Sequence, residues 1–162
     1  MEGNHRPDWL PQSVFPFKSR FNVVEGHNVH YIDEGEGPVL LLLHGNPTWS
    51  FLYRDIILRL RDRFRCIAPD YPGFGLSQPA PGYDFLPSSH ARVIEAFADE
   101  PMDKEHPKYL CAPCSNCKGQ IRDIINYYDA WEKAGIYYGG LVELIVNAMV
   151  DAKPGFIDWE WH

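Results

Sequence analysis

Apolar residues in the first part of the chain fall in short runs separated by turn-forming residues. Residues 21–24 and 29–32 are β-favouring, and the Glu-Gly-His-Asn stretch between them is typical of a turn, so the pair predicts a β-hairpin. Residues 39–43 are Val followed by four Leu. A run without polar alternation predicts a strand that is buried on both faces. Residues 65–69 predict a further strand.

Two helices are expected among these strands. The first begins at Ser50, and the second has Ser88 or Ser89 as its N-cap. The apolar positions of the first are Phe51, Leu52, Ile56, Ile57 and Leu60, and those of the second are Val93, Ile94 and Phe97. Strands that alternate with helices predict an α/β fold with a parallel, doubly wound sheet.

Composition narrows the classes of function. The 162 residues carry a net charge of −7, so we expect no nucleic-acid partner. The longest apolar run, residues 39–43, is too short to cross a bilayer, so we expect no membrane partner. Residues 1–11 lack the apolar core of a secretory signal, and a cytoplasmic location is therefore expected.

The character of the chain changes near residue 100. The first hundred residues contain eight Arg and one Lys, whereas the remainder contains one Arg and five Lys. We therefore divide the chain into residues 1–100, a polar, proline-flanked linker at 101–108, and a Cys-rich segment at 109–162. An ordinary domain boundary explains this change, but we favour a fusion of two unrelated pieces.

Two motifs in the first piece carry a family resemblance. Residues 44–50 read His-Gly-Asn-Pro-Thr-Trp-Ser, and residues 69–77 read Pro-Asp-Tyr-Pro-Gly-Phe-Gly-Leu-Ser. Together with the apolar strand at 39–43, they resemble haloalkane dehalogenases, which have the α/β-hydrolase fold. The resemblance covers about residues 6–97. It implies an incomplete α/β-hydrolase sheet followed by a small, mainly helical C-terminal segment.

The resemblance also implies a chemistry. In this family a carboxylate displaces halide from carbon, and a histidine then activates water to hydrolyse the ester. Asn46 corresponds to a donor that stabilises the departing halide, and its backbone N–H to part of the oxyanion site. The alternative is that Asn46 only completes an Asn-Pro turn. The pattern makes His44 and Asp70 structural. It implies a small halogenated organic substrate and no cofactor.

The segment that should carry the nucleophile is missing from the sequence. The family pattern places an Asp-Trp-Gly string after a buried strand, soon after the helix near residues 93–97, and no such string follows. Asp158, which precedes Trp159, and His162 are weak substitutes, because Glu160 replaces the small residue that the turn needs. Without that strand, residues 39–43 are expected to present an open apolar edge that invites self-association unless the second piece covers it.

The second piece has its own chemical signal. Cys111, Cys114 and Cys117 have C-x2-C-x2-C spacing, which suits zinc or an iron–sulfur cluster. Cys66 or His106 could supply a fourth ligand. Residues 109–160 resemble, weakly, the C-terminal end of heterodisulfide-reductase-like, cysteine-rich iron–sulfur proteins. The alternative is three free thiols.

Three functions follow from the sequence. The first is a haloalkane dehalogenase-like hydrolase that is inactive alone, because its nucleophile, acid and histidine are missing. The second is a metal-binding or electron-transfer module carried by the Cys-rich segment. The third is a non-functional fusion product.

Overall fold

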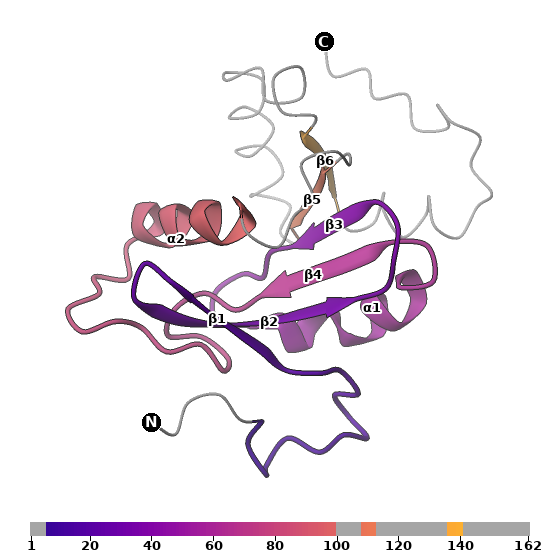
Figure 1. Ribbon diagram of the computed structural model, residues 1–162, viewed down its shortest axis with the longest axis horizontal. Helices are drawn as coiled ribbons and strands as arrows, with labels where there is room; N and C mark the ends of the chain where they lie inside the picture. Colours follow the sequence, from indigo (N-terminus) through magenta and orange to yellow (C-terminus); the bar gives the residue numbers. More distant parts are fainter. Residues whose placement is uncertain (1–5, 100–107, 113–135, 141–162) are drawn as a thin grey trace.

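A computed structural model describes residues 6–99, 108–112 and 136–140. The strands in these residues form one six-stranded sheet, in the order β1-β2-β4-β3-β5-β6 (Figure 1). The β1-β2 and β2-β4 pairs are antiparallel, whereas the pairs from β4 through β3 and β5 to β6 are parallel. The strands are β1 Arg20–Val24, β2 His27–Glu34, β3 Val39–Leu42, β4 Arg65–Pro69, β5 Lys108–Ala112 and β6 Ile136–Gly140.

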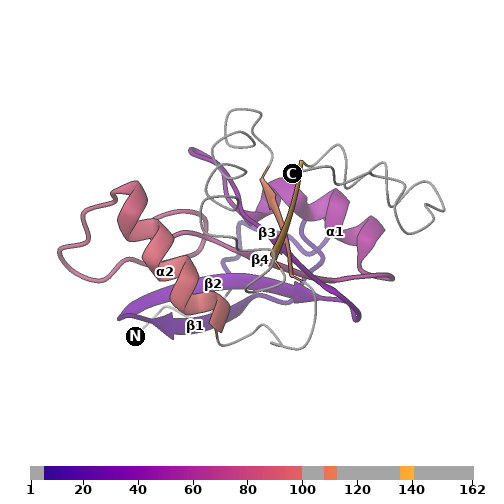
Figure 2. The ribbon, with the colours of Figure 1, turned by 90° about the horizontal axis from the view of Figure 1, so that it is seen from above.

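Helices cover both faces of the sheet. A 3₁₀ turn, η1 (Ser50–Tyr53), leads directly into α1 (Arg54–Leu60), and α2 (Pro87–Asp99) follows later. Figure 2 shows α1 and α2 on opposite sides of the strands. Two hydrophobic clusters form the cores. One contains Leu40, Leu42, Tyr53, Ile57 and Leu60, and the other contains Val39, Leu41, Ile67, Val93 and Phe97.

Successive side chains of β3 point alternately into these two cores, which explains why the strand is apolar at every position. All four of its residues are buried, as the unbroken apolar run predicts. The strand predicted at residues 65–69 is confirmed as β4. The predicted hairpin is also confirmed, with Glu25 and Gly26 at φ values of 47° and 82° in its turn. Two left-handed residues match the twist of the flanking strands, and glycine adopts this conformation without steric cost.

The helices differ from the sequence prediction in detail. The chain from Ser50 starts as a 3₁₀ turn, and Leu52, which the pattern places on the buried face, is 40% exposed. Tyr53 is buried in its place. The second helix starts at Pro87, so Ser88 and Ser89 lie within its first turn and do not precede it. Proline fits this start because its fixed φ suits a helix and its missing N–H would have no partner there.

The second piece of the chain covers the edge of residues 39–43 that would otherwise be open. Strand β5 pairs with β3 in parallel register, with Leu41 opposite Leu110 and Leu42 opposite Cys111. The sequence pattern assigns residues 109–112 to a cysteine motif, because a five-residue strand that contains Lys and Cys lacks a strong β pattern. Pairing across a long stretch of chain, which no local pattern encodes, supplies the missing edge partner.

Strand β6 then pairs with β5. Both strands fall within the region 108–162, where the sequence predicts the end of the linker and a mainly helical segment. The helices expected at residues 121–128 and 141–150 lie outside the described residues. In the part of the chain that the structure describes, no helix has the length and apolar character needed to cross a membrane.

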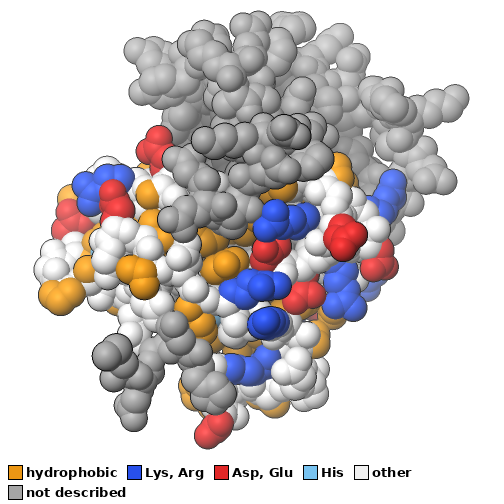
Figure 3. All heavy atoms as spheres, in the orientation of Figure 1, with side chains coloured by type: hydrophobic (Ala, Val, Ile, Leu, Met, Phe, Trp, Pro, Cys, Tyr) orange, Lys and Arg blue, Asp and Glu red, His pale blue; other side chains and the backbone are white. Residues whose placement is uncertain are grey.

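The surface of the molecule carries both positively and negatively charged side chains. Figure 3 shows Lys and Arg side chains interspersed with Asp and Glu toward the right of the face that it displays. Arg65 donates two hydrogen bonds to the Asp33 carboxylate, at 2.8 and 2.7 Å. Arg61 lies 3.8 Å from Glu34. These contacts neutralise part of the positive charge that five arginines between residues 54 and 65 bring to this region.

Candidate functional site

Asn46 lies in a tight turn just beyond the carboxyl end of β3. The Thr48 amide donates to the Gly45 carbonyl at 2.8 Å, and the Thr48 hydroxyl donates to the same oxygen at 2.7 Å. The Asn46–Pro47 peptide bond inside this turn is cis. Asn46 itself is exposed. The turn therefore presents an amide side chain to solvent at the edge of the sheet where ligands bind in open α/β folds.

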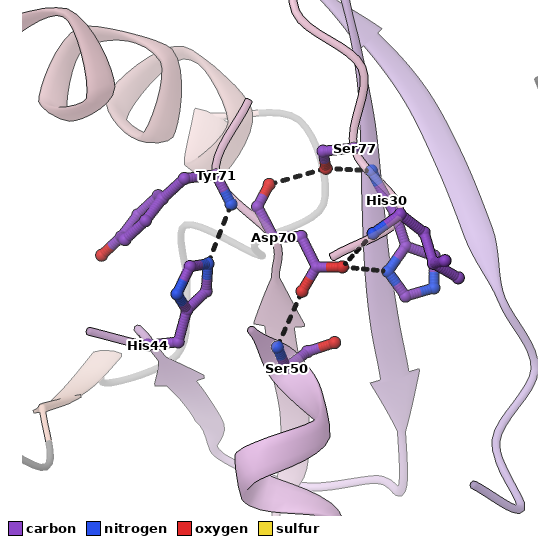
Figure 4. A network of polar contacts seen from close by, with 7 residues as sticks. His30, His44, Ser50, Asp70, Tyr71 and Ser77 are labelled. Atoms are coloured by element: carbon purple, nitrogen blue, oxygen red, sulfur yellow. Dashed lines mark hydrogen bonds and ion pairs between the residues drawn. The ribbon is translucent and has the colours of Figure 1, made fainter. Parts of the chain in front are cut away.

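Asp70 joins this turn to its neighbours (Figure 4). It follows the last residue of β4, and its carboxylate is fully buried. One oxygen accepts the Ser50 amide at 2.7 Å, and the other accepts the Leu76 amide at 3.0 Å and lies 2.8 Å from His30 Nδ1. Since Ser50 begins η1 directly after the Asn46 turn, this carboxylate holds the end of that turn in place.

The loop after Asp70 closes on the same residue. The Ser77 hydroxyl donates to the Asp70 carbonyl at 2.8 Å and accepts the His30 amide at 2.8 Å. Gly75 passes close to Asp70, with a φ of 52°. A Cβ atom there would overlap the Asp70 carboxylate and lie 2.8 Å from the Trp49 ring. Glycine at position 75 is therefore required by both backbone conformation and space.

His44 links the carboxyl ends of the two central strands. Its Nε2 accepts the Tyr71 amide at 3.0 Å (Figure 4). Its Nδ1 lies 3.1 Å from the Gly45 carbonyl. Burial lowers the pKa of His44 below its usual value. The hydrogen bond to Gly45 and the charge of Asp70 oppose this shift, and the charge of His90 adds to it. These contacts place His44 as a structural link between the end of β3 and the loop after β4.

An aromatic cluster packs beside the turn. Trp49 stacks on Phe51 with ring centroids 5.4 Å apart, and Phe15 lies 5.4 Å from Trp49. Arg6 fixes the N-terminal segment over this cluster by donating to three carbonyls, at Leu10, Phe15 and Phe17. The cluster gives the Asn46 turn an apolar flank.

The structure describes only some of the residues that the sequence singles out. His44, Asn46 and Asp70 meet at the carboxyl ends of β3 and β4. In the register of the sheet, Cys111 of β5 lies opposite Leu42, so the end of β5 reaches the same edge. Cys114, Cys117, His106, Asp158 and His162 lie outside the described residues. Within the described residues, no group of three or more His, Cys, Asp or Glu is placed to hold a metal ion.

Two further polar residues belong to this network: His30, which no motif includes, and Ser77, which ends the motif at residues 69–77 but had no role assigned to it. His30 is fully buried beside Asp70, and Ser77 is buried between the two. The signal for His30 was weak: a histidine among apolar residues of a predicted strand needs a polar partner once it is buried.

Comparisons with known proteins agree with this geometry. Residues 38–110 match the family model described as the alpha/beta hydrolase fold. Over 93 residues the chain is 57% identical to haloalkane dehalogenase 2 of Mycobacterium tuberculosis. The aligned residues make up 57% of this chain and 32% of that relative. The chain is also 40% identical, over 96 residues, to the cis-3-alkyl-4-alkyloxetan-2-one decarboxylase of Shewanella oneidensis, which covers 58% of this chain and 30% of that protein.

Solved structures show the same relationship. Haloalkane dehalogenase DbeA from Bradyrhizobium elkani matches with a TM-score of 0.63 and 25% identity, over 76% of this chain and 41% of that one. DatA from Agrobacterium tumefaciens, also a haloalkane dehalogenase, matches with a TM-score of 0.63 over 80% of this chain and 43% of its own. At 23% identity, the DatA match supports the fold alone.

The sheet order, the covering helices and the matched residues define an α/β-hydrolase fold. More narrowly, the N-terminal part of the chain has a partial haloalkane dehalogenase-like fold. The chain spans about a third of the length of the curated relatives that it matches.

Proposed function

We propose that this chain carries the halide-stabilising part of a haloalkane dehalogenase-like hydrolase, in which Asn46 is the halide and oxyanion donor. The observation that carries the proposal is the exposed Asn46 in a turn held by the Gly45 carbonyl and by Asp70. A donor fixed in this way needs no reorganisation when negative charge develops on a departing halide. The substrate class is a small halogenated organic molecule, and the chemistry needs no cofactor.

We further propose that the chain does not turn over substrate alone. Its sequence contains no Asp-Trp-Gly string, and the nucleophile, catalytic acid and histidine of the family pattern have no counterpart. Two of the relatives, a dehalogenase and an oxetanone decarboxylase, carry names for different reactions. The halide interpretation is favoured because the 57% identical relative is a dehalogenase.

The test is halide release from a small brominated alkane, together with bromide binding by the same folded protein. We expect bromide binding that weakens about tenfold in Asn46→Ala, since one charge-assisted hydrogen bond is lost. We expect no bromide release. Binding that is indifferent to Asn46→Ala would refute the assignment. Release that depends on Asn46 would show that a nucleophile is present, and Asp158→Asn would be examined next.

The alternative function is a metal or iron–sulfur site at Cys111, Cys114 and Cys117. Its support is the C-x2-C-x2-C spacing, together with the position of Cys111 in the sheet at the same edge as Asn46. An iron–sulfur cluster would colour the purified protein, and zinc would be found by elemental analysis. A colourless, metal-free protein that still binds bromide would support the hydrolase-derived function. A non-functional fusion product would instead show neither property and no cooperative unfolding.

A further inference from the structure

The Asn46 turn is organised around one carbonyl oxygen. The Gly45 oxygen accepts the Thr48 amide and the Thr48 hydroxyl, and His44 Nδ1 lies 3.1 Å from it as a third donor. Two of these donors come from within the turn. The third comes from the His44 side chain, which is itself 3% exposed and accepts the Tyr71 amide in the loop after β4. His44 therefore ties the start of the turn to the loop after β4, while Asp70 holds its end.

The contacts of the imidazole define its protonation state. The Tyr71 amide can only donate, so His44 Nε2 must be the acceptor in the 3.0 Å contact and carries no proton. The Gly45 carbonyl can only accept, so Nδ1 must carry the proton in the opposite contact. A doubly protonated ring would direct Nε2–H at the Tyr71 N–H. One of the two contacts would then be lost.

We propose that His44 is a positioning residue for Asn46, and that it holds the turn only as the neutral imidazole protonated at Nδ1. The inference rests on the proposed role of Asn46 as the halide donor. His44 does not touch the halide. It acts by fixing the Gly45 carbonyl relative to Tyr71, and it therefore fixes the residue that follows Gly45.

The surroundings of the ring favour the neutral form. His44 packs against Tyr71 from the loop after β4, with ring centroids 4.2 Å apart, and against Phe74 at 5.5 Å. The titratable groups facing it are the Asp70 carboxylate, the Tyr71 phenol and, from α2, His90. Burial is the largest influence on the pKa of His44 and lowers it, and His90 acts in the same direction against Asp70.

The direction of the pH effect follows. A histidine whose pKa is lowered by folding stabilises the native turn fully above the unfolded value of 6.5. This contribution is lost as the pH falls from 6.5 through the lower folded value. Bromide affinity should fall over the same range, even though a more acidic solution would ordinarily favour binding of an anion.

The experiment follows the ¹⁵N-labelled chain by NMR from about pH 8 down to the lowest pH at which it stays folded, because the folded pKa of His44 lies below the ordinary histidine value, with bromide titrations at each end. Two variants separate the contacts. His44→Gln can keep an acceptor near the Tyr71 amide but loses the donor to Gly45, whereas His44→Asn can keep the donor and loses the acceptor. The Ala80 amide donates to His27 Nδ1 at 2.9 Å and is an internal control that His44 variants should not affect.

We expect ring nitrogen shifts typical of the Nδ1–H tautomer, a Tyr71 amide that titrates with His44, and about tenfold weaker bromide binding at the acidic end and in either variant. An Nε2–H tautomer, or a Tyr71 amide indifferent to His44 titration, would overturn the inference. These two measurements need only the wild-type chain. If they hold but no bromide binds at any pH, the positioning stands and the proposed role of Asn46 fails.

Discussion

The Asp70 carboxylate accepts N–H groups from η1, from the following loop and from His30 of β2. Replacing one carboxylate oxygen with an amide places an N–H₂ group against one of these donors. We expect Asp70→Asn to lower the free energy of unfolding by about 2–4 kcal/mol, because a buried donor then loses its partner. Urea denaturation measures this, with the exposed Asp62→Asn as the control. Equal effects of the two variants would contradict the structural role.

Burial is expected to make the Cys66 thiol unreactive. It is fully buried in the α1-side core, and burial, followed by the charges of Asp33 and Glu34, raises the pKa of its thiol to about 12. The thiolate is the reactive species, so at about pH 8 Cys66 should be inert toward iodoacetamide. Mass spectrometry should find the Cys66 peptide unmodified in the folded protein and alkylated in urea. Alkylation without urea would show that this core opens readily.

Single residues were predicted from the sequence where a motif carried them. His44 and Asp70 were assigned structural roles, and their contacts agree. His30 was not found, because a lone histidine in a strand gives no sign of the carboxylate that it meets forty residues later. Its partner is set by the antiparallel register of β2 and β4, which is not a local property.

At the scale of elements, the turn after β2 depends on a close backbone approach. Gly35 has a φ of 87°, and a Cβ there would overlap the backbone carbonyls of Arg61 and Phe64 at the end of α1. Carbonyls of the main chain cannot rotate aside as a side chain can. We expect Gly35→Ala to destabilise the protein by more than about 2 kcal/mol, since φ strain and overlap add.

Gly82 supplies the matched control for this prediction. Its φ of 79° is similar, but a Cβ added to it would meet no atom within 4 Å. Gly82→Ala should therefore cost only the conformational preference, about 1 kcal/mol. Thermal unfolding of both variants makes the comparison. A smaller loss at position 35 than at position 82 would mean that α1 and the β2–β3 turn are not packed in this way.

Elements whose signal is local were predicted well, and those that depend on distant partners were not. The β1–β2 hairpin, β3, β4 and the apolar face of α2 follow from runs and turns that lie close together in the sequence. Strand β5 was missed because its residues 108–112 have little β character of their own. Its place in the sheet comes from β3, whose apolar edge requires a partner.

At the scale of the whole molecule, the second piece of the chain completes the sheet of the first. A chain ending at residue 100 would lack β5 and β6 and would expose the backbone of β3 along one edge. We expect this truncated chain to self-associate, whereas the full chain should be less aggregated at the same concentration. Light scattering after size-exclusion chromatography measures the difference. A monomeric, cooperatively folding 1–100 fragment would show that β5 is dispensable.

The pairing of Leu40 with Tyr109 also has a consequence during synthesis. A ribosome adds about 5–20 residues per second, so β3 leaves the exit tunnel several seconds before β5 does. Throughout that interval β3 has no strand to pair with on the side that β5 later occupies. The need for chaperones in the cell should therefore depend on the rate of translation between β3 and β5. Slower translation of this stretch would lengthen the time during which the unpaired edge of β3 can aggregate.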